Sequence, residues 1–333
     1  MQVSIKAISV YLPKNKLSND DLSIEFPSWS ADKISKKTGI YSRGISDKNE
    51  TSCDMAVSVS EKLFFDHKID KKKIDFILLC TQSPDYFLPT TACIVQNKLG
   101  LQTNCGALDF NLGCSGYIYG LALAKGLISS GIANNVLLIT SETYSKYIHN
   151  KDKSNRTIFG DAAAASLISK DDYGTIERFS LGSDGSGAKN LIVKNGAAKY
   201  PDVIGKNEFD NDEFLKNDSN LYMNGKEIFM FTSNAVPKIV HDCLIKNNLL
   251  INQVDLFIFH QANSYMLEYM RRKIKIPKEK FYIYIKNVGN TVSSTIPIAL
   301  DDAIKNKRIT PGMNVLLVGF GVGYSFGATI IKY

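Results

Sequence analysis

The stretch Ala107-Leu108-Asp109-Phe110-Asn111-Leu112-Gly113-Cys114-Ser115-Gly116-Tyr117 joins a hydrophobic strand to an apolar, small-residue helix predicted to end near Ser129. Cys114 lies at that junction, where unpaired backbone N–H groups and the helix dipole favour a thiolate. Gly113 and Gly116 allow a sharp turn and leave room for a substrate. The pattern indicates an activated nucleophile. A buried structural cysteine is the alternative that this stretch leaves open.

Strands and helices alternate on both sides of this stretch. Buried strands are predicted at 74–80 and 135–140, and helices at about 54–65 and 91–98. Continuous apolar strands that alternate with helices are typical of a parallel sheet covered on both faces. The sequence therefore predicts an α/β fold.

Two strand signatures recur at nearly the same long interval. Val254-Asp255-Leu256-Phe257-Ile258-Phe259 resembles Ile74-Asp75-Phe76-Ile77-Leu78-Leu79 at an offset of 180 residues, counted from Asp75 to Asp255. Asn314-Val315-Leu316-Leu317 resembles Asn135-Val136-Leu137-Leu138 at an offset of 179, counted from Asn135 to Asn314. The interval indicates an internal duplication, with chance similarity of apolar strands as the alternative. We predict one half at residues 1–172, with the cysteine, and a second at 173–333.

The composition excludes several classes of protein. The 333 residues are 44% hydrophobic and 22% charged, which argues against disorder. No apolar run of the sequence approaches the roughly 18 residues of a membrane span, and no signal peptide is recognisable, so we expect a cytoplasmic protein that does not contact membranes. The formal charge of +7 is spread along the chain, which does not favour nucleic acid as a partner. The six cysteines lack metal-ligand spacing, so neither a metal site nor a disulfide framework is expected.

Two polar residues follow strands in the second half. His260 comes directly after the strand predicted at 254–259, and Asn290 lies between a strand predicted at 281–285 and a helix predicted at 292–304. Ligands of parallel sheets bind outside the carboxyl ends of the strands, so both residues are well placed for chemistry. For Asn290, a helix cap or a turn residue is the alternative.

A glycine-rich turn, Gly319-Phe320-Gly321-Val322-Gly323-Tyr324-Ser325-Phe326-Gly327, lies near the C-terminus. A dinucleotide site is disfavoured there, because a terminal strand and no helix is predicted to follow. The alternative is that the glycine-rich turn lets the backbone approach a substrate closely, with its N–H groups directed at a developing oxyanion. A Cys, a His and an Asn, each just past a strand end, suit thioester chemistry in which Cys114 accepts an acyl group.

Taken together, these residues resemble the thiolase superfamily and, within it, the β-ketoacyl-acyl-carrier-protein (ACP) synthase III family. The resemblance covers almost the whole chain and includes the glycine-rich turn. It also rests on Gly113-Cys114-Ser115-Gly116, His260-Gln261-Ala262-Asn263, Gly289-Asn290-Thr291, Phe159-Gly160-Asp161 and Thr38-Gly39-Ile40. The family implies a five-layered α-β-α-β-α fold of two duplicated halves, a homodimer, and no metal or organic cofactor.

The resemblance also implies a reaction. An acyl thioester primer, acyl-CoA or acyl-ACP, would acylate Cys114. Malonyl-ACP would then lose CO₂ with help from His260 and Asn290, and its carbanion would attack the thioester to give a β-ketoacyl-ACP. The backbone N–H groups of Cys114 and Val322 would form the oxyanion hole. The alternatives are an acyltransferase that uses a non-malonyl acceptor and a non-catalytic partner subunit.

Substrate-side residues follow from the resemblance, with departures from the family pattern. Lys33, Lys37 and Lys153 match positions where relatives that use CoA often have Trp or Arg, and lysine keeps the charge but not the planar surface. Trp29 either compensates for that surface, or the primer is not bound to CoA. Asn263 is assigned to the same side of the site.

Two further assignments concern the pocket and the carrier protein. Leu88 matches a pocket gate that is often a large aromatic residue, and a smaller gate is compatible with a primer longer or bulkier than acetyl. Arg271, Arg272 and Lys273 form a local basic cluster, which the resemblance assigns to docking of acidic ACP. A solvated helix face is the alternative for this cluster.

Overall fold

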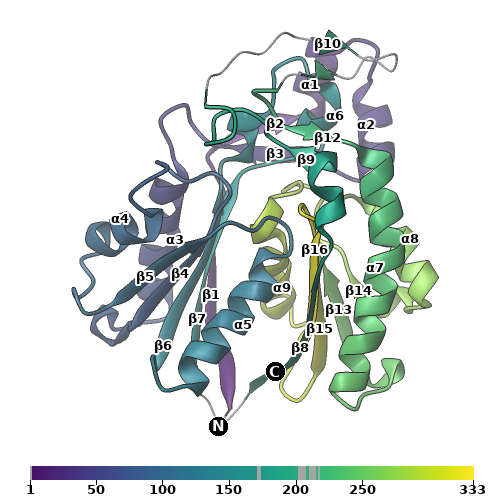
Figure 1. Cartoon of the computed structure of the whole chain (residues 1–333). Coiled ribbons are helices and arrows are strands. Elements are labelled where there is room, and N and C mark those ends of the chain that lie inside the picture. The colour runs from purple at the N-terminus through teal and green to yellow at the C-terminus, as the bar shows by residue number, and fades with distance from the viewer. Residues whose placement is uncertain (1, 171–173, 202–207, 210–214, 217) are drawn as a thin grey trace.

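The computed structural model describes residues 2–170, 174–201, 208–209, 215–216 and 218–333. Within these residues, two five-stranded mixed sheets lie side by side with helices between them and outside them (Figure 1). The first sheet has the order β1 (Val3–Tyr11), β7 (Ala162–Lys170), β6 (Asn135–Glu142), β4 (Phe76–Cys80), β5 (Gly106–Phe110). The second has the order β14 (Phe281–Tyr282), β13 (Leu256–Phe259), β15 (Asn314–Gly321), β16 (Ser325–Lys332), β8 (Thr175–Ser183).

The two sheets have the same topology. In the first, β4 pairs in parallel with β5 and β6, whereas β6 with β7 and β7 with β1 are antiparallel. In the second, β13 pairs in parallel with β14 and β15, and β15 with β16 and β16 with β8 are antiparallel. The predicted duplication is therefore confirmed. The boundary predicted between residues 172 and 173 lies outside the described residues.

One hydrogen-bond pattern explains why the strand signatures recur. Asp75 precedes β4, and its Oδ2 accepts the Asn135 N–H at 2.8 Å; Asp255 precedes β13, and its Oδ2 accepts the Asn314 N–H at the same distance. In both halves the Asp N–H also donates to the Asn carbonyl oxygen, at 3.0 and 2.9 Å. Each Asp thereby fixes the register of a central strand against its neighbour, which a strand buried on both faces requires.

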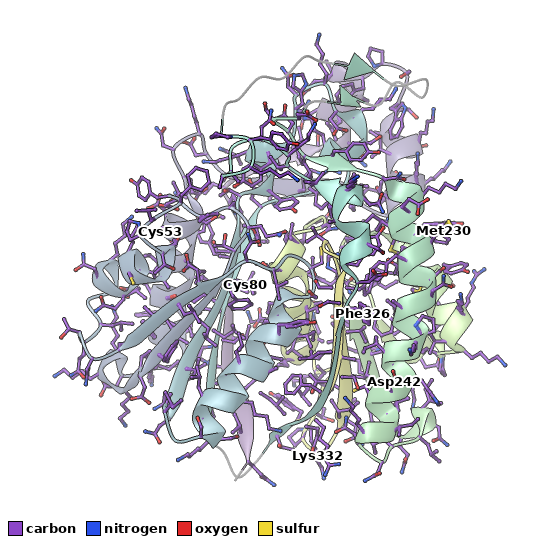
Figure 2. All side chains as sticks on the ribbon, viewed as in Figure 1. Cys53, Cys80, Met230, Asp242, Phe326 and Lys332 are labelled. Atoms are coloured by element: carbon purple, nitrogen blue, oxygen red, sulfur yellow. The ribbon has the colours of Figure 1, made fainter. Side chains whose placement is uncertain are left out.

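Three helical layers alternate with the two sheets. Two helices, α3 (Ser52–Asp66) and α4 (Thr91–Lys98), cover the outer face of the first sheet, and α7 (Gly225–Lys246) and α8 (Ser264–Ile274) cover that of the second (Figure 1). Between the sheets lie α5 (Gly116–Ser129) and α9 (Thr295–Lys305), in a core that includes residues of both sheets. Side chains fill the spaces between the layers (Figure 2). The predicted α-β-α-β-α architecture is confirmed.

Short elements form a cap beyond one end of the layers (Figure 1). The cap covers the end of the first sheet at which β5 ends. Cys114 lies at that end, because only a short loop separates it from the last residue of β5. The cap contains β2 (Asn15–Ser18), α1 (Asn19–Glu25), α2 (Ala31–Thr38), β3 (Ser42–Ile45), α6 (Lys153–Arg156), β9 (Leu191–Ile192), β10 (Glu208–Phe209), β11 (Leu215–Lys216) and β12 (Tyr222–Met223).

Candidate active site

Cys114 lies in the connection between β5 and α5, just before the helix begins at Gly116, and is 6% exposed. Two glycines make room around it. A Cβ at Gly321 would lie 3.0 Å from the Cys114 Sγ, and a Cβ at Gly116 would lie 2.2 Å from the Sγ of Cys80. The backbone of β15 can therefore approach Cys114, and that of α5 can approach Cys80, only because these two residues lack side chains.

Burial affects the pKa of Cys114 more than the helix dipole does. Burial raises the pKa of the thiol, and the Glu142 carboxyl acts in the same direction when it is ionised. The dipole of α5 favours the thiolate by at most about 2 kcal/mol, which is less than the several kcal/mol that removing an anion from water costs. The burial effect therefore opposes the thiolate that the helix N-terminus favours.

His260 directly follows β13 and is 2% exposed. Burial lowers the pKa of its imidazole to about 3, and a hydrogen bond with the Val292 backbone opposes this shift only in part. The ring is therefore neutral at physiological pH. Its Nδ1 lies 2.7 Å from the Thr295 Oγ1, which also lies 3.1 Å from the Val292 carbonyl oxygen. Because the Thr295 hydroxyl has one hydrogen, its direction decides which ring nitrogen carries the proton.

Asn290 is held by backbone from the other half of the molecule. It forms a parallel β-bridge with Phe159, in which the Asn290 N–H donates to the Ile158 carbonyl at 2.9 Å and its carbonyl accepts the Gly160 N–H at 3.0 Å. The side-chain Oδ1 accepts the Val292 N–H at 3.0 Å. The amide oxygen is therefore engaged, and the NH₂ group is the end that can donate to a substrate.

The three residues come from separate loops and converge on one buried region. Phe320 packs edge-to-face on His260, with 5.4 Å between the ring centroids, and the next residue, Gly321, contacts Cys114. Val292, which binds Asn290, belongs to the same apolar cluster as Cys114. An acyl chain on the sulfur would meet the apolar side chains of this cluster. Its other buried members are Tyr144, Phe159, Leu191 and Leu221, of which the sequence motifs included Phe159.

The three lysines assigned to the primer side surround one tryptophan. The Nζ atoms of Lys33, Lys37 and Lys153 lie 5.6, 4.7 and 5.7 Å from the centre of the Trp29 ring. These distances are in the range of cation–π contacts. A flat ring flanked by positive charges suits a ligand that combines an aromatic base with phosphate groups.

Two other predicted site residues are Asn263 and Leu88, which lie on segments different from those of the three lysines around Trp29. Asn263 caps α8, because its Oδ1 accepts the Met266 N–H at 2.8 Å. Leu88 is 82% exposed in the loop between β4 and α4. Among the residues that the structure describes, it does not belong to the apolar cluster around Cys114. Asn263 thus has a structural role of its own, and the Leu88 side chain is exposed in the single chain.

The basic cluster at the end of α8 is partly engaged within the chain. Arg271 donates twice to the Glu268 carboxylate, at 2.6 and 2.8 Å, and once to a backbone carbonyl at 2.8 Å. Arg272 contacts the same carboxylate at 2.8 Å, but its side chain is 74% exposed. Arg272 and Lys273 line a groove of about 860 Å³ that also includes Lys36 of α2. The positions that are open to a partner are therefore Arg272, Lys273 and Lys36.

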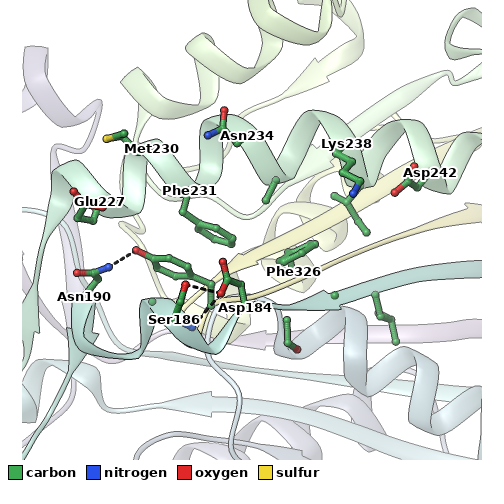
Figure 3. A pocket seen from close by; sticks show the side chains of 17 residues that line it. Asp184, Ser186, Asn190, Glu227, Met230, Phe231, Asn234, Lys238, Asp242 and Phe326 are labelled. Atoms are coloured by element: carbon green, nitrogen blue, oxygen red, sulfur yellow. Dashed lines mark hydrogen bonds between the residues drawn. The ribbon is translucent and has the colours of Figure 1, made fainter.

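A second groove, of about 700 Å³, lies between α7 and the segment that follows β8 (Figure 3). Phe231 of α7 stacks on Tyr324 at 3.9 Å, and Asn190 donates to the Tyr324 hydroxyl at 2.7 Å. These contacts anchor one end of the glycine-rich turn that reaches Cys114. Among the described residues that line this groove, none belongs to the group of Cys114, His260 and Asn290.

Some features are absent from the described residues. No helix in this part of the chain is long and apolar enough to cross a membrane. No group of three or more His, Cys, Asp or Glu side chains is arranged there to hold a metal ion. All six cysteines are described, and all are free.

Comparisons with known proteins give a consistent result. The family described as 3-oxoacyl-[acyl-carrier-protein (ACP)] synthase III matches residues 108–185, and the family described as its C terminal matches residues 244–333. The first range contains Cys114, and the second contains both His260 and Asn290. The matched ranges therefore include all three residues that converge in the structure.

Individual relatives match over their full length. A β-ketoacyl-ACP synthase III of Fusobacterium nucleatum is 36% identical over 99% of this chain and 98% of its own length. One of Clostridium perfringens strain 13 is 38% identical over 97% of each chain. The crystal structure of a 3-oxoacyl-(acyl-carrier-protein) synthase III matches with a TM-score of 0.98 and 44% identity over the whole of both chains. The chain therefore belongs to the β-ketoacyl-ACP synthase III family, whose members are acyltransferase-class condensing enzymes with a thiolase-like fold.

Proposed function

We propose that the chain catalyses a decarboxylative Claisen condensation between an acyl group on Cys114 and malonyl-ACP. The observation that carries this proposal is the convergence of a buried thiol, a neutral imidazole and a donating amide on one buried region that contains an apolar cluster. A neutral imidazole and an amide NH₂ are suited to stabilise charge that develops on a carbonyl oxygen. The proposal includes a cytoplasmic location, because acyl-CoA and ACP thioesters are formed there.

The first step transfers the acyl group. The Cys114 sulfur attacks the carbonyl carbon of an acyl-CoA or acyl-ACP, the new C–S bond forms, and the donor sulfur leaves with the proton that Cys114 loses. The backbone N–H groups of Cys114 and Val322 stabilise the oxyanion of this step. The close approach of Gly321 to the Cys114 sulfur supports this assignment of the glycine-rich turn.

The second step forms the new carbon–carbon bond. Malonyl-ACP loses CO₂, and the electron pair of the broken bond moves toward the thioester carbonyl, whose oxygen accepts hydrogen bonds from His260 Nε2 and Asn290 Nδ2. His260 donates from Nε2 when the Thr295 hydroxyl turns from the Val292 carbonyl oxygen and donates to Nδ1 instead. The carbanion attacks the acyl group, and Cys114 leaves as a thiolate that takes up a proton. The proposal needs no metal or organic cofactor, because these side chains hold the developing charge.

Release of CO₂ distinguishes this reaction from acyl transfer to another acceptor. The acylated chain is incubated with malonyl-ACP that carries a labelled free carboxyl group, and labelled CO₂ is compared with the loss of acyl groups from Cys114. The condensing reaction predicts equal amounts of both. Discharge of Cys114 by another acceptor, without labelled CO₂, would favour the acyltransferase alternative.

Trp29 and its lysines are part of the proposal as the nucleotide side of an acyl-CoA site. Replacing Trp29 with alanine should raise KM for acyl-CoA about tenfold, because a stacked base is worth about 1–3 kcal/mol. KM for acyl-ACP should be unchanged, since ACP presents no adenine. Initial rates of Cys114 acylation with each donor measure both values.

Tyr200 offers a matched control for Trp29. Lys194 and Lys199 lie 5.5 and 5.8 Å from its ring centre, so Tyr200→Ala removes another aromatic ring flanked by lysines. The control should leave KM for both donors unchanged. An equal rise of KM for acyl-CoA and acyl-ACP in Trp29→Ala would contradict the nucleotide assignment.

Arg272 and Lys273 are part of the proposal as a docking surface for acidic ACP. Reversing both charges, by Arg272→Glu with Lys273→Glu, should raise KM for malonyl-ACP about tenfold at low salt and less at high salt. Acylation of Cys114 by a small acyl-CoA should be unchanged. Arg271 is left intact, because its paired bonds to Glu268 are structural.

Lys72 and Lys73 provide the control for this charge reversal. Both are exposed and lie next to α3, so Lys72→Glu with Lys73→Glu changes the net charge equally at a different place. If the two double variants raise KM equally, overall charge and not a docking surface explains the result.

A homodimer is also part of the proposal. β5 is an edge strand of the first sheet, and exposed apolar side chains lie on it and on the loop that precedes α4. The exposed fractions are 46% for Leu108, 62% for Tyr86, 84% for Phe87 and 82% for Leu88. Such an edge favours pairing with a second copy. In such a dimer, Leu88 can act as a pocket gate only for the partner chain, across the interface. A chain that sediments as a monomer would therefore contradict both the homodimer and the assignment of Leu88 as a gate.

A further inference from the structure

A buried carboxyl group outside the proposed reaction joins the two halves of the molecule. Glu142 is the last residue of β6 and is 0% exposed. One carboxyl oxygen accepts the Ser293 hydroxyl at 2.9 Å, and the other accepts the Gln82 N–H and the Ser83 hydroxyl, each at 3.1 Å. Gln82 and Ser83 follow β4 of the first sheet, whereas Ser293 lies shortly after Asn290 in the second half. Glu142 is therefore a direct link between the halves at the active site.

The turn at residues 291–295, which contains Ser293, is strained. Val292 has a φ of 54°, a left-handed conformation that β-branched residues rarely adopt. A strained conformation of this kind persists only where the surrounding contacts hold it. The hydrogen bond from Ser293 to Glu142 acts on the residue directly after the strained one.

This turn also orients the Asn290 amide and the His260 imidazole, the two groups that are proposed to bind the malonyl thioester oxygen as it gains negative charge. The Val292 N–H binds the Asn290 Oδ1 at 3.0 Å. The Val292 carbonyl oxygen lies 3.1 Å from the Thr295 hydroxyl, which contacts His260 Nδ1 at 2.7 Å. A change in the Val292 backbone would therefore displace the amide and alter the hydrogen bond that selects the imidazole tautomer.

We propose that Glu142 is a positioning residue, which acts through Ser293 to hold the 291–295 turn in the geometry that decarboxylation requires. This inference rests on the condensing reaction proposed above. It predicts an effect on the second step, which uses Asn290 and His260. It predicts little effect on acylation of Cys114, which uses backbone N–H groups.

The protonation state of Glu142 is compatible with this role. Burial raises the pKa of its carboxyl to about 8, although the hydrogen bonds from Gln82, Ser293 and Ser83 oppose that shift. The protonated carboxyl can still bind Ser293, because a hydroxyl can accept a hydrogen as well as donate one. The hydrogen bond between Glu142 and Ser293 is therefore kept at neutral pH. A protonated Glu142 also adds no second buried negative charge near the sulfur when Cys114 leaves as a thiolate.

The test compares Ser293→Ala, Glu142→Asp and their double variant. Aspartate keeps the acid but is one methylene shorter, so it cannot span the same partners. Ser141→Ala is the matched control: Ser141 directly precedes Glu142 in β6 and is also buried, but its hydroxyl donates to the Ser52 carbonyl oxygen of α3 at 2.7 Å and not to the 291–295 turn. Each variant is acylated on Cys114 and followed by intact mass, then mixed with malonyl-ACP in a single turnover while CO₂ is measured. Thermal unfolding is recorded for each.

Ser293→Ala and Glu142→Asp should each slow CO₂ release about tenfold or more, because small displacements of oriented groups have effects of this size. The double variant should be no slower than the slower single variant, since both changes remove one link. Acylation rates, and CO₂ release by Ser141→Ala, should stay within about twofold of the wild type.

Several results would overturn the proposal. These are normal CO₂ release by Ser293→Ala, additive losses in the double variant, an equal loss of the acylation rate, or the same loss in Ser141→Ala. The wild type is measured first. If it does not release CO₂ at all, the condensing reaction itself fails, and the positioning role fails with it.

Discussion

The Cys114→Ala variant will form no acyl adduct and will turn over at least about 10⁴-fold more slowly than the wild type, because the covalent intermediate is lost. Cys80 cannot replace it, although Cys80 lies close to α5. Its Sγ is 2.9 Å from the Leu112 carbonyl oxygen, and burial raises the pKa of its thiol well above the usual value. Intact protein mass after incubation with acyl thioesters measures the adduct, and CO₂ release from malonyl-ACP measures turnover.

Cys93 provides the control for this experiment. It is the cysteine with an exposed side chain, so a non-specific acyl donor would modify it first. Cys93→Ala should accept one acyl group on Cys114 and turn over like the wild type. An adduct that persists in Cys114→Ala and disappears in Cys93→Ala would contradict the assignment of the nucleophile.

The His260→Ala variant will still accept the acyl group on Cys114 but will release CO₂ more slowly by a factor on the order of 10²–10³, the usual effect of removing one oxyanion donor. Acylation should persist because the backbone N–H groups of Cys114 and Val322 stabilise that step. Pre-acylated enzyme mixed with malonyl-ACP in a single turnover measures the second step alone. His241→Ala is the control, since His241 is exposed on α7. Equal loss of both steps would contradict the division of roles.

The pH dependence of the wild type tests the same residue. Because burial lowers the pKa of His260 to about 3, its neutral form persists from about pH 5 to about pH 8. Single-turnover CO₂ release should therefore show no inflection near 6.5, the ordinary value for histidine. In the unfolded chain, His260 takes up a proton near pH 6.5, whereas in the folded chain it stays neutral until about pH 3. The contribution of His260 to the free energy of unfolding is therefore lost progressively as pH falls from 6.5 toward 3. A rate inflection near 6.5 that His260→Ala removes would contradict the neutral imidazole.

The duplicated fold could be predicted from the sequence because its strongest signals have local causes. Asp75 and Asp255 recur at a fixed interval since each fixes the register of a central strand by the same bonds to Asn135 or Asn314. The position of His260 followed from the end of an apolar strand. These features depend on neighbours in the sequence or on a rule of sheet topology, so they can be recognised without a structure.

The turn after Asn290 could not be predicted. A helix was expected from residue 292, but α9 begins at Thr295, and Val292 adopts a left-handed conformation. Contacts from the other half hold this conformation, and a β-branched residue gives no local sign of it. Glu142 was missed for a related reason: its one signal is a charged residue at the end of an otherwise uncharged strand, and its partner Ser293 is 151 residues away.

The sequence also could not predict which side chains are exposed and which are paired within the chain. Arg271, Arg272 and Lys273 are equally basic in the sequence, but the structure engages Arg271 with Glu268 and leaves Arg272 74% exposed at its side chain. Leu88 matched a pocket position, although it is 82% exposed in the single chain. Such distinctions depend on distant residues or on a second copy.

The most direct test of the account is the discharge of acyl-Cys114 by malonyl-ACP. Purified chain is incubated with a panel of acyl-CoA and acyl-ACP donors, its intact mass is recorded, and malonyl-ACP is added while CO₂ and ACP products are followed. The account predicts an acyl adduct on Cys114 that malonyl-ACP removes, with one CO₂ and one β-ketoacyl-ACP for each adduct lost. An adduct that malonyl-ACP cannot remove, or the absence of an adduct with every donor, would contradict it.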